Sequence, residues 1–491
     1  MAPHNVASHH DRLKELIVTT SIFQQRRAGM LLHLSSVPGP HGIGDLGPGA
    51  FEVANWIAAS GSTLWQMLPV GPVGKGDSPY SATSSFAIEP LFLSLEILAR
   101  EKLIAPSALR APSELGRGKT NYAKARAFKW PRFHQAFANF VADGGMRRRD
   151  FQKFLRLNVS WLNGWCDFAA QDGNDPLLHA FLQFQLAKQW GQLRAHCQKI
   201  GVHLIGDLPI FVSLNSADVR DRPDLFRLNA KGKPDVVTGV PPDCFSKNGQ
   251  LWEHPHYRWT THKRDNFAWW ISRVKIALDR FDALRIDHFV GLKHAYEIPG
   301  SAKTARHGVW RPTPGRELLT AIQKKLGTLP LIAEDLGALT PSVEKLRDDF
   351  HLPGMKLLHN AFYGPNSSDL PHRHPQHCVV YPGTHDNDTT RGWWQGLPQA
   401  ARARFMELSG ANPNRPEEAM IRLAYASPSN TAIVAAQDAL GLTRRDRMNV
   451  PGVSHGNWSW RLEPNALTAK SAAKLRTLAV DCGRFKPKHS T

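Results

Sequence analysis

Short apolar runs of β-prone residues alternate with longer stretches of helical periodicity along most of the chain. Eight of the apolar runs predict strands, at residues 30–34, 63–68, 203–212, 282–286, 331–333, 355–358, 379–381 and 431–436. Stretches with helical spacing lie between most of them, at residues 49–60, 176–200, 267–279, 315–326 and 341–350. Eight strands separated by helices predict an α/β fold, the (β/α)8 TIM barrel. An open doubly wound sheet is the weaker alternative, because no Gly-x-Gly-x-x-Gly follows the first strand.

One long segment interrupts this alternation. Residues 105–175 combine a helical pattern with many basic side chains and a proline-rich start. The segment is far longer than the roughly 2–6 residues that usually connect a strand to a helix. We expect it to form a mainly helical inserted subdomain.

Three acidic side chains lie in short segments that follow predicted strands: Asp287, Glu334 and Asp386. The carboxyl ends of parallel strands form the mouth of a barrel, where active sites lie. Arg285 precedes Asp287 by two residues, so both side chains share one face of a strand, and the guanidinium can keep the carboxylate ionised. Glu334 leaves an apolar strand, where loss of water raises the pKa of a carboxyl group. Capping of the next helix is the alternative for any one of these acids, but three together favour a site.

Carboxyl groups arranged in this way can cleave a glycosidic bond. One protonates the leaving oxygen, and another attacks the sugar or activates water. The expected substrate is therefore neutral and rich in hydroxyl groups. The ring of His385, which precedes Asp386, can donate hydrogen bonds to such hydroxyl groups.

The chain is strongly basic, which raises the alternative of a nucleic-acid-binding protein. It has 61 Lys and Arg against 42 Asp and Glu, a formal net charge of +19. The positive charges are dispersed, with small groups at residues 147–149, 444–445 and 470–488, and no nucleic-acid-binding motif accompanies them. We expect a solvated basic surface and no nucleic-acid partner.

Other features of the composition narrow the class of protein. Hydrophobic residues make up 42% of the 491 residues, which is typical of a packed globular protein. The apolar runs are far shorter than the ~20 residues that cross a bilayer, and residues 1–25 lack a secretory h-region, so we expect no membrane partner. The five cysteines have no Cys-x-x-Cys spacing, which indicates reduced thiols and a cytoplasmic location. The His-rich residues 372–377 lack metal-ligand spacing, so we expect no metal site.

Many short motifs occur in order along most of the chain. They lie at residues 29–33, 42–47, 64–66, 76–80, 205–212, 249–252, 447–449, 451–452 and 457–461, in addition to the three acidic segments. With these motifs the chain resembles the 4-α-glucanotransferases called amylomaltases or disproportionating enzymes, which form glycoside hydrolase family 77. The resemblance implies that α-1,4-glucan segments are transferred between maltooligosaccharides, or between glucans derived from starch or glycogen. It implies no cofactor.

The resemblance also implies roles for single residues. Asp287 would be the nucleophile that forms a covalent glycosyl-enzyme, Glu334 the acid/base, and Asp386 the group that stabilises the transition state. An acceptor sugar whose 4-hydroxyl is deprotonated by Glu334 would then displace Asp287, which makes the reaction a retaining double displacement. Substrate binding is expected from Ser78, Tyr80, Asp207, Phe245, Trp252, Arg285, His288 and His385.

Four positions depart from the family pattern. Cys244 stands in place of a tyrosine, Lys75 in place of an aromatic residue, Val290 in place of an arginine, and Lys293 in place of an acid. The three catalytic acids are intact, so we expect an active enzyme. An α-glucan hydrolase of the same clan is the alternative, since it would share the carboxylates and need no acceptor.

These expectations divide the chain into three parts. Residues 1–28 form an N-terminal extension, residues 29–461 the catalytic barrel, and residues 462–491 a basic tail that we expect to be solvated. The barrel carries the helical insertion at about 105–175 and an active-site loop insertion at 213–266.

Overall fold

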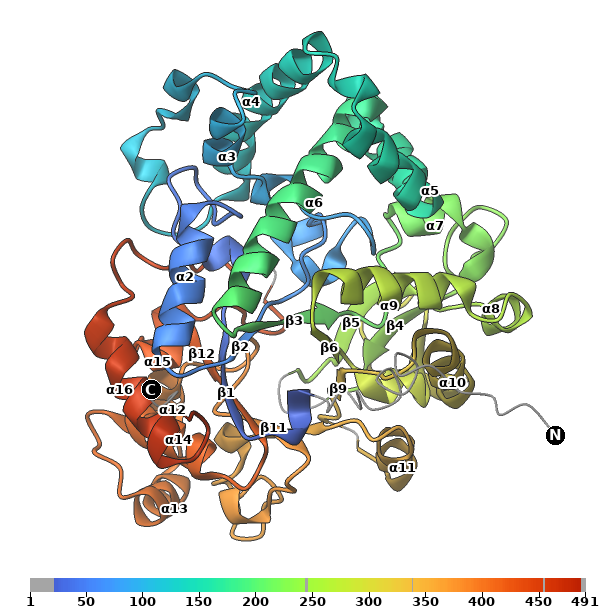
Figure 1. Ribbon diagram of the computed structural model, residues 1–491. Helices are drawn as coiled ribbons and strands as arrows, with labels where there is room; N and C mark the ends of the chain where they lie inside the picture. The colour runs from blue at the N-terminus through green and yellow to red at the C-terminus, as the bar shows by residue number, and fades with distance from the viewer. Residues whose placement is uncertain (1–21, 243–245, 338, 454, 487–491) are drawn as a thin grey trace, which may run out of the picture.

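Eight parallel strands form a nearly closed barrel in the computed structural model, which describes residues 22–242, 246–337, 339–453 and 455–486 (Figure 1). The strands are β1 (Arg27–Leu31), β2 (Leu64–Gln66), β3 (His203–Leu208), β6 (Ala283–Ile286), β9 (Leu331–Ala333), β10 (Gly354–Leu357), β11 (Cys378–Tyr381) and β12 (Thr431–Ala435). They are hydrogen-bonded in the order β10-β11-β12-β1-β2-β3-β6-β9. The two ends of this sheet meet where the Ala333 amide donates to the Pro353 carbonyl at 2.9 Å. The predicted (β/α)8 fold is confirmed, and each predicted strand overlaps an observed one.

Alternate strand residues point into the barrel, because successive side chains of a strand face opposite sides. The inward apolar residues pack as one buried cluster that includes Leu31, Leu64, Ile205, Ala283, Ile332, Val379 and Ile433. Gly29 also faces inward, and a Cβ there would lie only 2.9 Å from the Cβ of Leu64, so the barrel needs a glycine at this position. Two residues beyond Ile205 and Ala283, the inward positions are Asp207 and Arg285. The alternation that builds the apolar core therefore also places charged groups at the barrel mouth.

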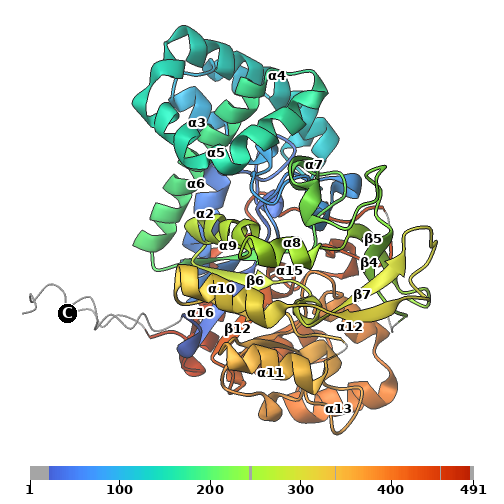
Figure 2. The same ribbon diagram turned by 90° about the vertical axis from the view of Figure 1, so that its right-hand side faces the viewer.

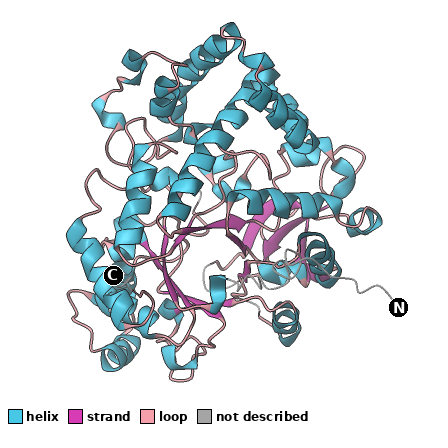
Figure 3. Cartoon of the chain, viewed as in Figure 1, coloured by secondary structure: helices cyan, strands magenta, loops and turns pink. Residues whose placement is uncertain are grey.

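Helices surround the barrel and cover its outer face (Figure 3). They are α2 (Pro48–Ala59), α6 (Pro176–Lys199), α9 (Ala268–Arg280), α10 (Gly315–Leu326), α11 (Pro341–Asp349), α12 (Thr390–Gly396), α13 (Gln399–Ser409), α14 (Pro416–Ala426) and α15 (Ala436–Ala439). Local signals set their ends. The Asp175 side chain caps α6 by accepting from the Leu177 amide at 2.8 Å, and Gly327, with φ of 81°, ends α10.

The inserted helices form a separate layer beyond the barrel (Figure 2). The predicted segment 105–175 begins with two 3-10 turns and contains α4 (Tyr122–Ala142) and α5 (Arg149–Ala169); α3 (Leu95–Arg100) precedes it. Rings from α4, α5 and α6 interlock, with centroids 5.3 Å apart for Phe140 and Phe151 and 5.2 Å apart for Phe151 and Phe184. These aromatic contacts fix the insertion to the long helix that leads back to β3.

A second, antiparallel sheet, which is not among the predicted elements, stands beside the barrel mouth. Its strands are β4 (Val236–Val240), β5 (Gln250–Pro255), β7 (His294–Pro299) and β8 (Val309–Pro312), in the order β5-β4-β7-β8. The short helices α7 (Ala217–Asp221) and α8 (Trp259–Arg264) flank the first two strands along the chain. The expected loop insertion 213–266 is thus half of a sheet, and the segment after β6 supplies the other half.

The C-terminal segment packs against the barrel, so the expectation of a solvated tail is wrong for the described residues 462–486. Helix α16 (Ala469–Asp481) lies against α2 and buries Ala472, Leu475 and Ala479. Arg484 is 2% exposed and donates to six backbone carbonyl groups, those of Ala424, Tyr425, Ser427, Ser429, Asn430 and Arg27. The lysines of the segment face outward, whereas its apolar side chains and Arg484 join the core. Within the described part of the chain, no helix has both the length and the apolar character needed to span a membrane.

Replacing Arg484 by Ala would leave several buried carbonyl groups without a donor. We expect the free energy of unfolding to fall by about 2–4 kcal/mol, measured as a lower midpoint in thermal or urea denaturation. Arg445→Ala, at an exposed arginine, is the control and should change stability by less than about 0.5 kcal/mol. Equal effects of the two substitutions would show that the carbonyl contacts of Arg484 do not stabilise the fold.

Candidate active site

Neighbouring strands bring charged groups together at the barrel mouth. In the parallel register of β3, β6 and β9, Asp207 lies beside Arg285 and Ile286 lies beside Ala333. Asp287 and Glu334 are the next residues of β6 and β9, so they leave the barrel side by side. Both acids therefore lie at strand exits, as the sequence predicts.

Arg285 is the cation at the centre of this group. Its Nη1 lies 2.9 and 2.7 Å from the two carboxylate oxygens of Asp207 and 2.9 Å from Oδ1 of Asp287. Burial disfavours the charge of Arg285, but the carboxylates of Asp207 and Asp287 outweigh it and hold the Arg285 pKa well above its usual value. Asp207 is buried, which raises its pKa to about 7 against the opposing effect of Arg285. Asp287 keeps 27% of its side chain exposed, so it can reach a substrate while Arg285 holds it.

Glu334 has a different environment. Its carboxyl oxygens accept from the backbone amides of His288 at 2.7 Å and Leu336 at 3.1 Å. Burial raises the pKa of Glu334 to about 8; Arg285 opposes the rise and Asp287 adds to it. A carboxyl group with this pKa is protonated at neutral pH, as a general acid must be.

Asp386 lies in the loop after β11. Its Oδ1 accepts from Nδ2 of Asn449 at 2.7 Å, and its Oδ2 lies 3.4 Å from Nε2 of His385. The His385 ring stacks on Tyr80 with centroids 5.2 Å apart, and Trp458 packs beside both rings. Asn449 and Trp458 have no predicted role, and the motifs at residues 447–449 and 457–461 are their signals in the sequence.

Tyr80 joins the aromatic stack to the charged group. Its hydroxyl donates to Oδ2 of Asp207 at 2.8 Å. Ser78 contacts the backbone of Tyr80: its Oγ accepts from the Tyr80 amide at 3.3 Å and caps the 3-10 turn Pro79–Ser81. The expected binding residues Ser78, Tyr80 and Asp207 therefore form one connected unit.

His288 and Trp252 form a second pair of rings next to the charged group. His288 has left-handed backbone angles, φ of 52° and ψ of 52°, which a residue other than glycine adopts at a cost of about 1–3 kcal/mol. Its ring packs at right angles to Trp252 of β5, with centroids 4.9 Å apart. Burial lowers the pKa of His288 to about 4, so the imidazole is neutral. The strained turn places the neutral ring of the residue that follows Asp287 against a residue of the second sheet. Phe245, also expected to bind substrate, lies outside the described residues.

A group of three residues with possible metal-ligand spacing lies away from this site. It consists of His41, Asp45 and Glu96. The ammonium group of Lys129 is 2.6 Å from Oδ2 of Asp45 and also donates to two backbone carbonyl groups. The ammonium group of Lys129 thus supplies the positive charge that a metal ion would otherwise bring to these residues.

Comparisons with known proteins agree with this geometry. A family model described as 4-alpha-glucanotransferase matches residues 32–177 and 170–468. A 4-alpha-glucanotransferase of Thermus thermophilus is 39% identical over 494 residues, which cover 92% of this chain and 98% of that protein. This chain belongs to the 4-α-glucanotransferase family. The resemblance read from the motifs is confirmed.

Further members of the 4-α-glucanotransferase family support the assignment. The chloroplastic/amyloplastic enzyme of Solanum tuberosum is 38% identical, and the alignment covers 94% of this chain and 87% of that protein. The structure of amylomaltase from Streptococcus agalactiae in complex with acarbose has a TM-score of 0.90 and 33% identity, covering 94% of this chain and all of that one. Amylomaltase from Corynebacterium glutamicum has a TM-score of 0.76 at 16% identity and shares the fold.

The departures from the 4-α-glucanotransferase pattern lie in different environments. Val290 is 5% exposed and packs in the core that surrounds the barrel, so an apolar side chain suits its place. Lys293 is partly exposed just before β7. Lys75 is exposed, and its Nζ lies 3.5 Å from Oε2 of Glu253, which follows Trp252. Cys244 lies outside the described residues.

Replacing Arg285 by Met would leave Asp207 and Asp287 without their shared cation. The buried Asp207 would then bind its proton more tightly in the folded than in the unfolded protein, so folding would become less favourable as the pH rises. We expect a loss of about 3 kcal/mol or more at pH 8 and a smaller loss at pH 5, followed by thermal denaturation.

Arg148→Met is the matched control, because it breaks an exposed pair with Asp150. It should cost less than about 1 kcal/mol at either pH. If Arg285→Met lost the same stability at both pH values, the shared cation would not control these carboxyl groups.

Proposed function

We propose that this chain transfers α-1,4-glucan segments between maltooligosaccharides by a retaining double displacement, with Asp287 as nucleophile and Glu334 as acid/base. One observation carries the proposal: Arg285 binds Asp287 but makes no hydrogen bond to Glu334 among the contacts described. A carboxyl group held by a cation and a carboxyl group with a raised pKa thus stand side by side at the barrel mouth. Membership of the 4-α-glucanotransferase family supports the same chemistry.

In the first half-reaction, Glu334 gives its proton to the leaving glycosidic oxygen while a carboxylate oxygen of Asp287 bonds to the anomeric carbon. The glycosidic C–O bond breaks, and a glycosyl ester of Asp287 forms. The Arg285 guanidinium, 2.9 Å from Asp287, orients the carboxylate for attack. The negative charge of Asp386 stabilises the oxocarbenium-like transition state.

In the second half-reaction, the 4-hydroxyl of an acceptor sugar gives its proton to the Glu334 carboxylate and attacks the anomeric carbon. The ester bond to Asp287 breaks, and an α-1,4 bond forms again with retained stereochemistry. Water in place of the acceptor would give hydrolysis. The outcome depends on how well the walls around Asp287 exclude water and bind a sugar.

Substrate contacts follow from the two walls of the site. On one side, Tyr80 and His385 present a stacked pair of rings, and Asp207 anchors the Tyr80 hydroxyl. On the other side, His288 and Trp252 present an imidazole and an indole. Polar ring edges and apolar faces together suit a sugar, which has both hydroxyl groups and apolar C–H surfaces. We include Phe245 and, through Tyr80, Ser78 in this set.

The proposed substrates are maltooligosaccharides and glucans derived from starch or glycogen. An α-glucan hydrolase of the same clan is the second candidate. The exposed Lys75 beside Glu253 favours the hydrolase, because a charged pair stands where the family pattern has an aromatic residue.

We also propose a cytoplasmic location. The cysteines among the described residues, Cys166, Cys197, Cys378 and Cys482, are free thiols, which suits a reducing compartment. Fractionation of the producing cells tests this, and recovery in a secreted or organellar fraction would contradict it.

Incubation with maltotriose alone tests the proposed activity. We expect glucose together with a ladder of longer maltooligosaccharides, separated by chromatography, because each transfer from one maltotriose lengthens another. Asp287→Asn should abolish both products. Glucose and maltose without longer products would instead identify the hydrolase.

The pH dependence of kcat/KM on maltotriose tests the role of Glu334. Activity should fall as the pH rises through about 8, because the first half-reaction needs the protonated form of a group with that pKa. The imidazoles of His288 and His385 have lowered pKa values and do not account for such a limb. A profile that stays flat to pH 9.5, or activity that survives Glu334→Gln, would remove Glu334 from this role.

A further inference from the structure

A loop from a distant part of the chain holds the third acid of the site. Asn449 is 9% exposed and lies just beyond the 3-10 turn Arg444–Asp446. Its Nδ2 donates to Oδ1 of Asp386 at 2.7 Å, and its backbone amide donates to the His385 carbonyl at 3.2 Å. One residue thus binds both members of the His385–Asp386 pair.

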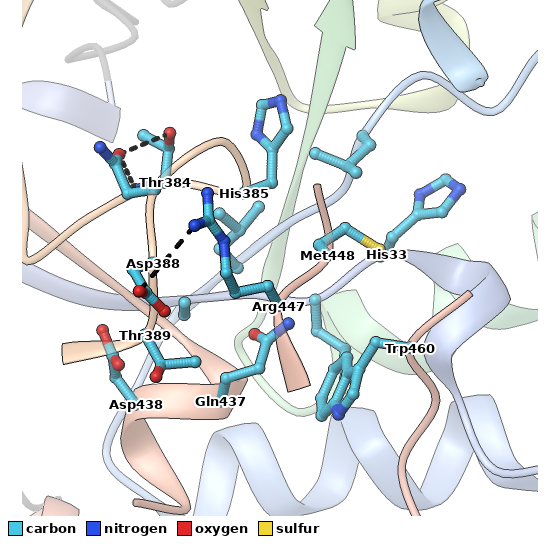
Figure 4. A pocket seen from close by; sticks show the side chains of 15 residues that line it. His33, Thr384, His385, Asp388, Thr389, Gln437, Asp438, Arg447, Met448 and Trp460 are labelled. Atoms are coloured by element: carbon cyan, nitrogen blue, oxygen red, sulfur yellow. Dashed lines mark hydrogen bonds and ion pairs between the residues drawn. The ribbon is translucent and has the colours of Figure 1, made fainter. Parts of the chain in front are cut away.

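Arg447 ties this loop to the same segment. Its Nη2 donates to the Asp386 carbonyl at 3.0 Å, and its Nε donates to the Asn449 carbonyl at 3.2 Å. Its Nη1 lies 3.9 Å from Oδ2 of Asp388. Figure 4 shows the guanidinium between His385 and Asp388, at a small cavity behind His385. Arg447 therefore clamps the backbone on both sides of the Asn449–Asp386 hydrogen bond.

Asp386 needs such support more than the other two acids do. It follows β11 at a distance, in a loop, and 44% of its side chain is exposed. Asp287 and Glu334, by contrast, directly follow barrel strands and are held by Arg285 and by backbone amides. Without a partner, an exposed aspartate samples several side-chain rotamers.

A neutral amide at position 449 suits the task of orienting the Asp386 carboxylate. An amide donates a hydrogen bond without carrying charge, so it orients the carboxylate and leaves the negative charge of Asp386 in place. A lysine or arginine would form an ion pair with Asp386, and an acid would repel it. A neutral donor on Oδ1 leaves Oδ2 of Asp386 for His385 and the substrate.

We propose that Asn449 is a positioning residue that fixes the Asp386 carboxylate for the glucan transition state, and that Arg447 holds Asn449 in place. This inference rests on the proposed function, because it assumes that Asp386 takes part in the reaction. It goes beyond the three acids by assigning a task to the motif at residues 447–449.

Kinetics of Asn449→Ala on maltotriose are the first test. We expect kcat to fall about 10- to 100-fold, the usual effect of losing one hydrogen bond to a charged group, with KM changed by less than about threefold. Asn457→Ala is the matched control. Asn457 bonds to Val450 and Val453 of the same loop and makes no hydrogen bond to Asp386, so kcat should stay within about twofold of the parent. Equal losses in both variants would mean that the loop acts only through its overall structure.

The pH profile of Asn449→Asp distinguishes a positioning role of Asn449 from a purely structural one, which would leave the pH dependence of kcat/KM unchanged. It is nearly isosteric and places a second carboxyl group at hydrogen-bond distance from Asp386, so the two would share a proton. The acid limb of kcat/KM should shift upward by about one pH unit or more, and activity should recover as the pH rises. The titratable and charged groups that face Asp386, namely His385, Tyr80 and Arg447, are the same in this variant and in Asn449→Ala. Asn449→Ala should show no such shift.

Asp386→Asn separates failure of this inference from failure of the proposed function. If Asp386→Asn kept full activity, the role of Asp386 itself would be wrong. If Asp386→Asn were inactive while Asn449→Ala and Asn449→Asp matched the parent enzyme, the positioning role of Asn449 would be wrong. If the inference holds, adding Asn449→Ala to Asp386→Asn causes no further loss in the residual activity.

Discussion

The positive charge of Arg285 at the barrel mouth is the interaction on which the site depends. Three carboxyl groups, Asp207, Asp287 and Glu334, converge there, and a low-dielectric site cannot hold three negative charges close together without compensation. Arg285 makes its hydrogen bonds and ion pair to Asp207 and Asp287. Among the described residues, the carboxyl group of Glu334 accepts hydrogen bonds from backbone amides, and burial raises its pKa to about 8. A single cation among three acids thus separates an oriented carboxylate from a protonated acid, which is the division of roles that a double displacement requires.

The barrel supplies the rigid base of the site, and segments far apart in the chain supply its walls. Tyr80 comes from the loop after β2, Trp252 from the second sheet, and Asn449 and Trp458 from the C-terminal part of the chain. Each wall is attached to the barrel by a specific contact, such as the Tyr80 hydroxyl bond to Asp207 or the packing of Trp252 on His288. The strained backbone of His288 is held by this packing and by the bond from its own amide to Glu334.

Closure of the barrel explains why the C-terminal segment is ordered. Strand β1 pairs with β12, so the first and last strands lie side by side. Arg484 donates to backbone carbonyl groups of both Arg27 and the turn before β12, and α16 covers α2. The basic C-terminal segment therefore helps to close the barrel at the end where the strands begin.

The sequence by itself determined the eight barrel strands, most of the helices between them, and the position of Asp287, Glu334 and Asp386 after strands. These features depend on local periodicity and on which residue follows a buried run, and both can be read from neighbours along the chain. Only the tertiary structure decided the second sheet, in which β4 pairs with β7 from beyond β6. It also decided the Tyr80–Asp207 and Asn449–Asp386 contacts and the burial of the basic C-terminal segment. These features depend on pairing between residues far apart in sequence, and no local pattern of apolar and polar positions specifies which distant segment a side chain will meet.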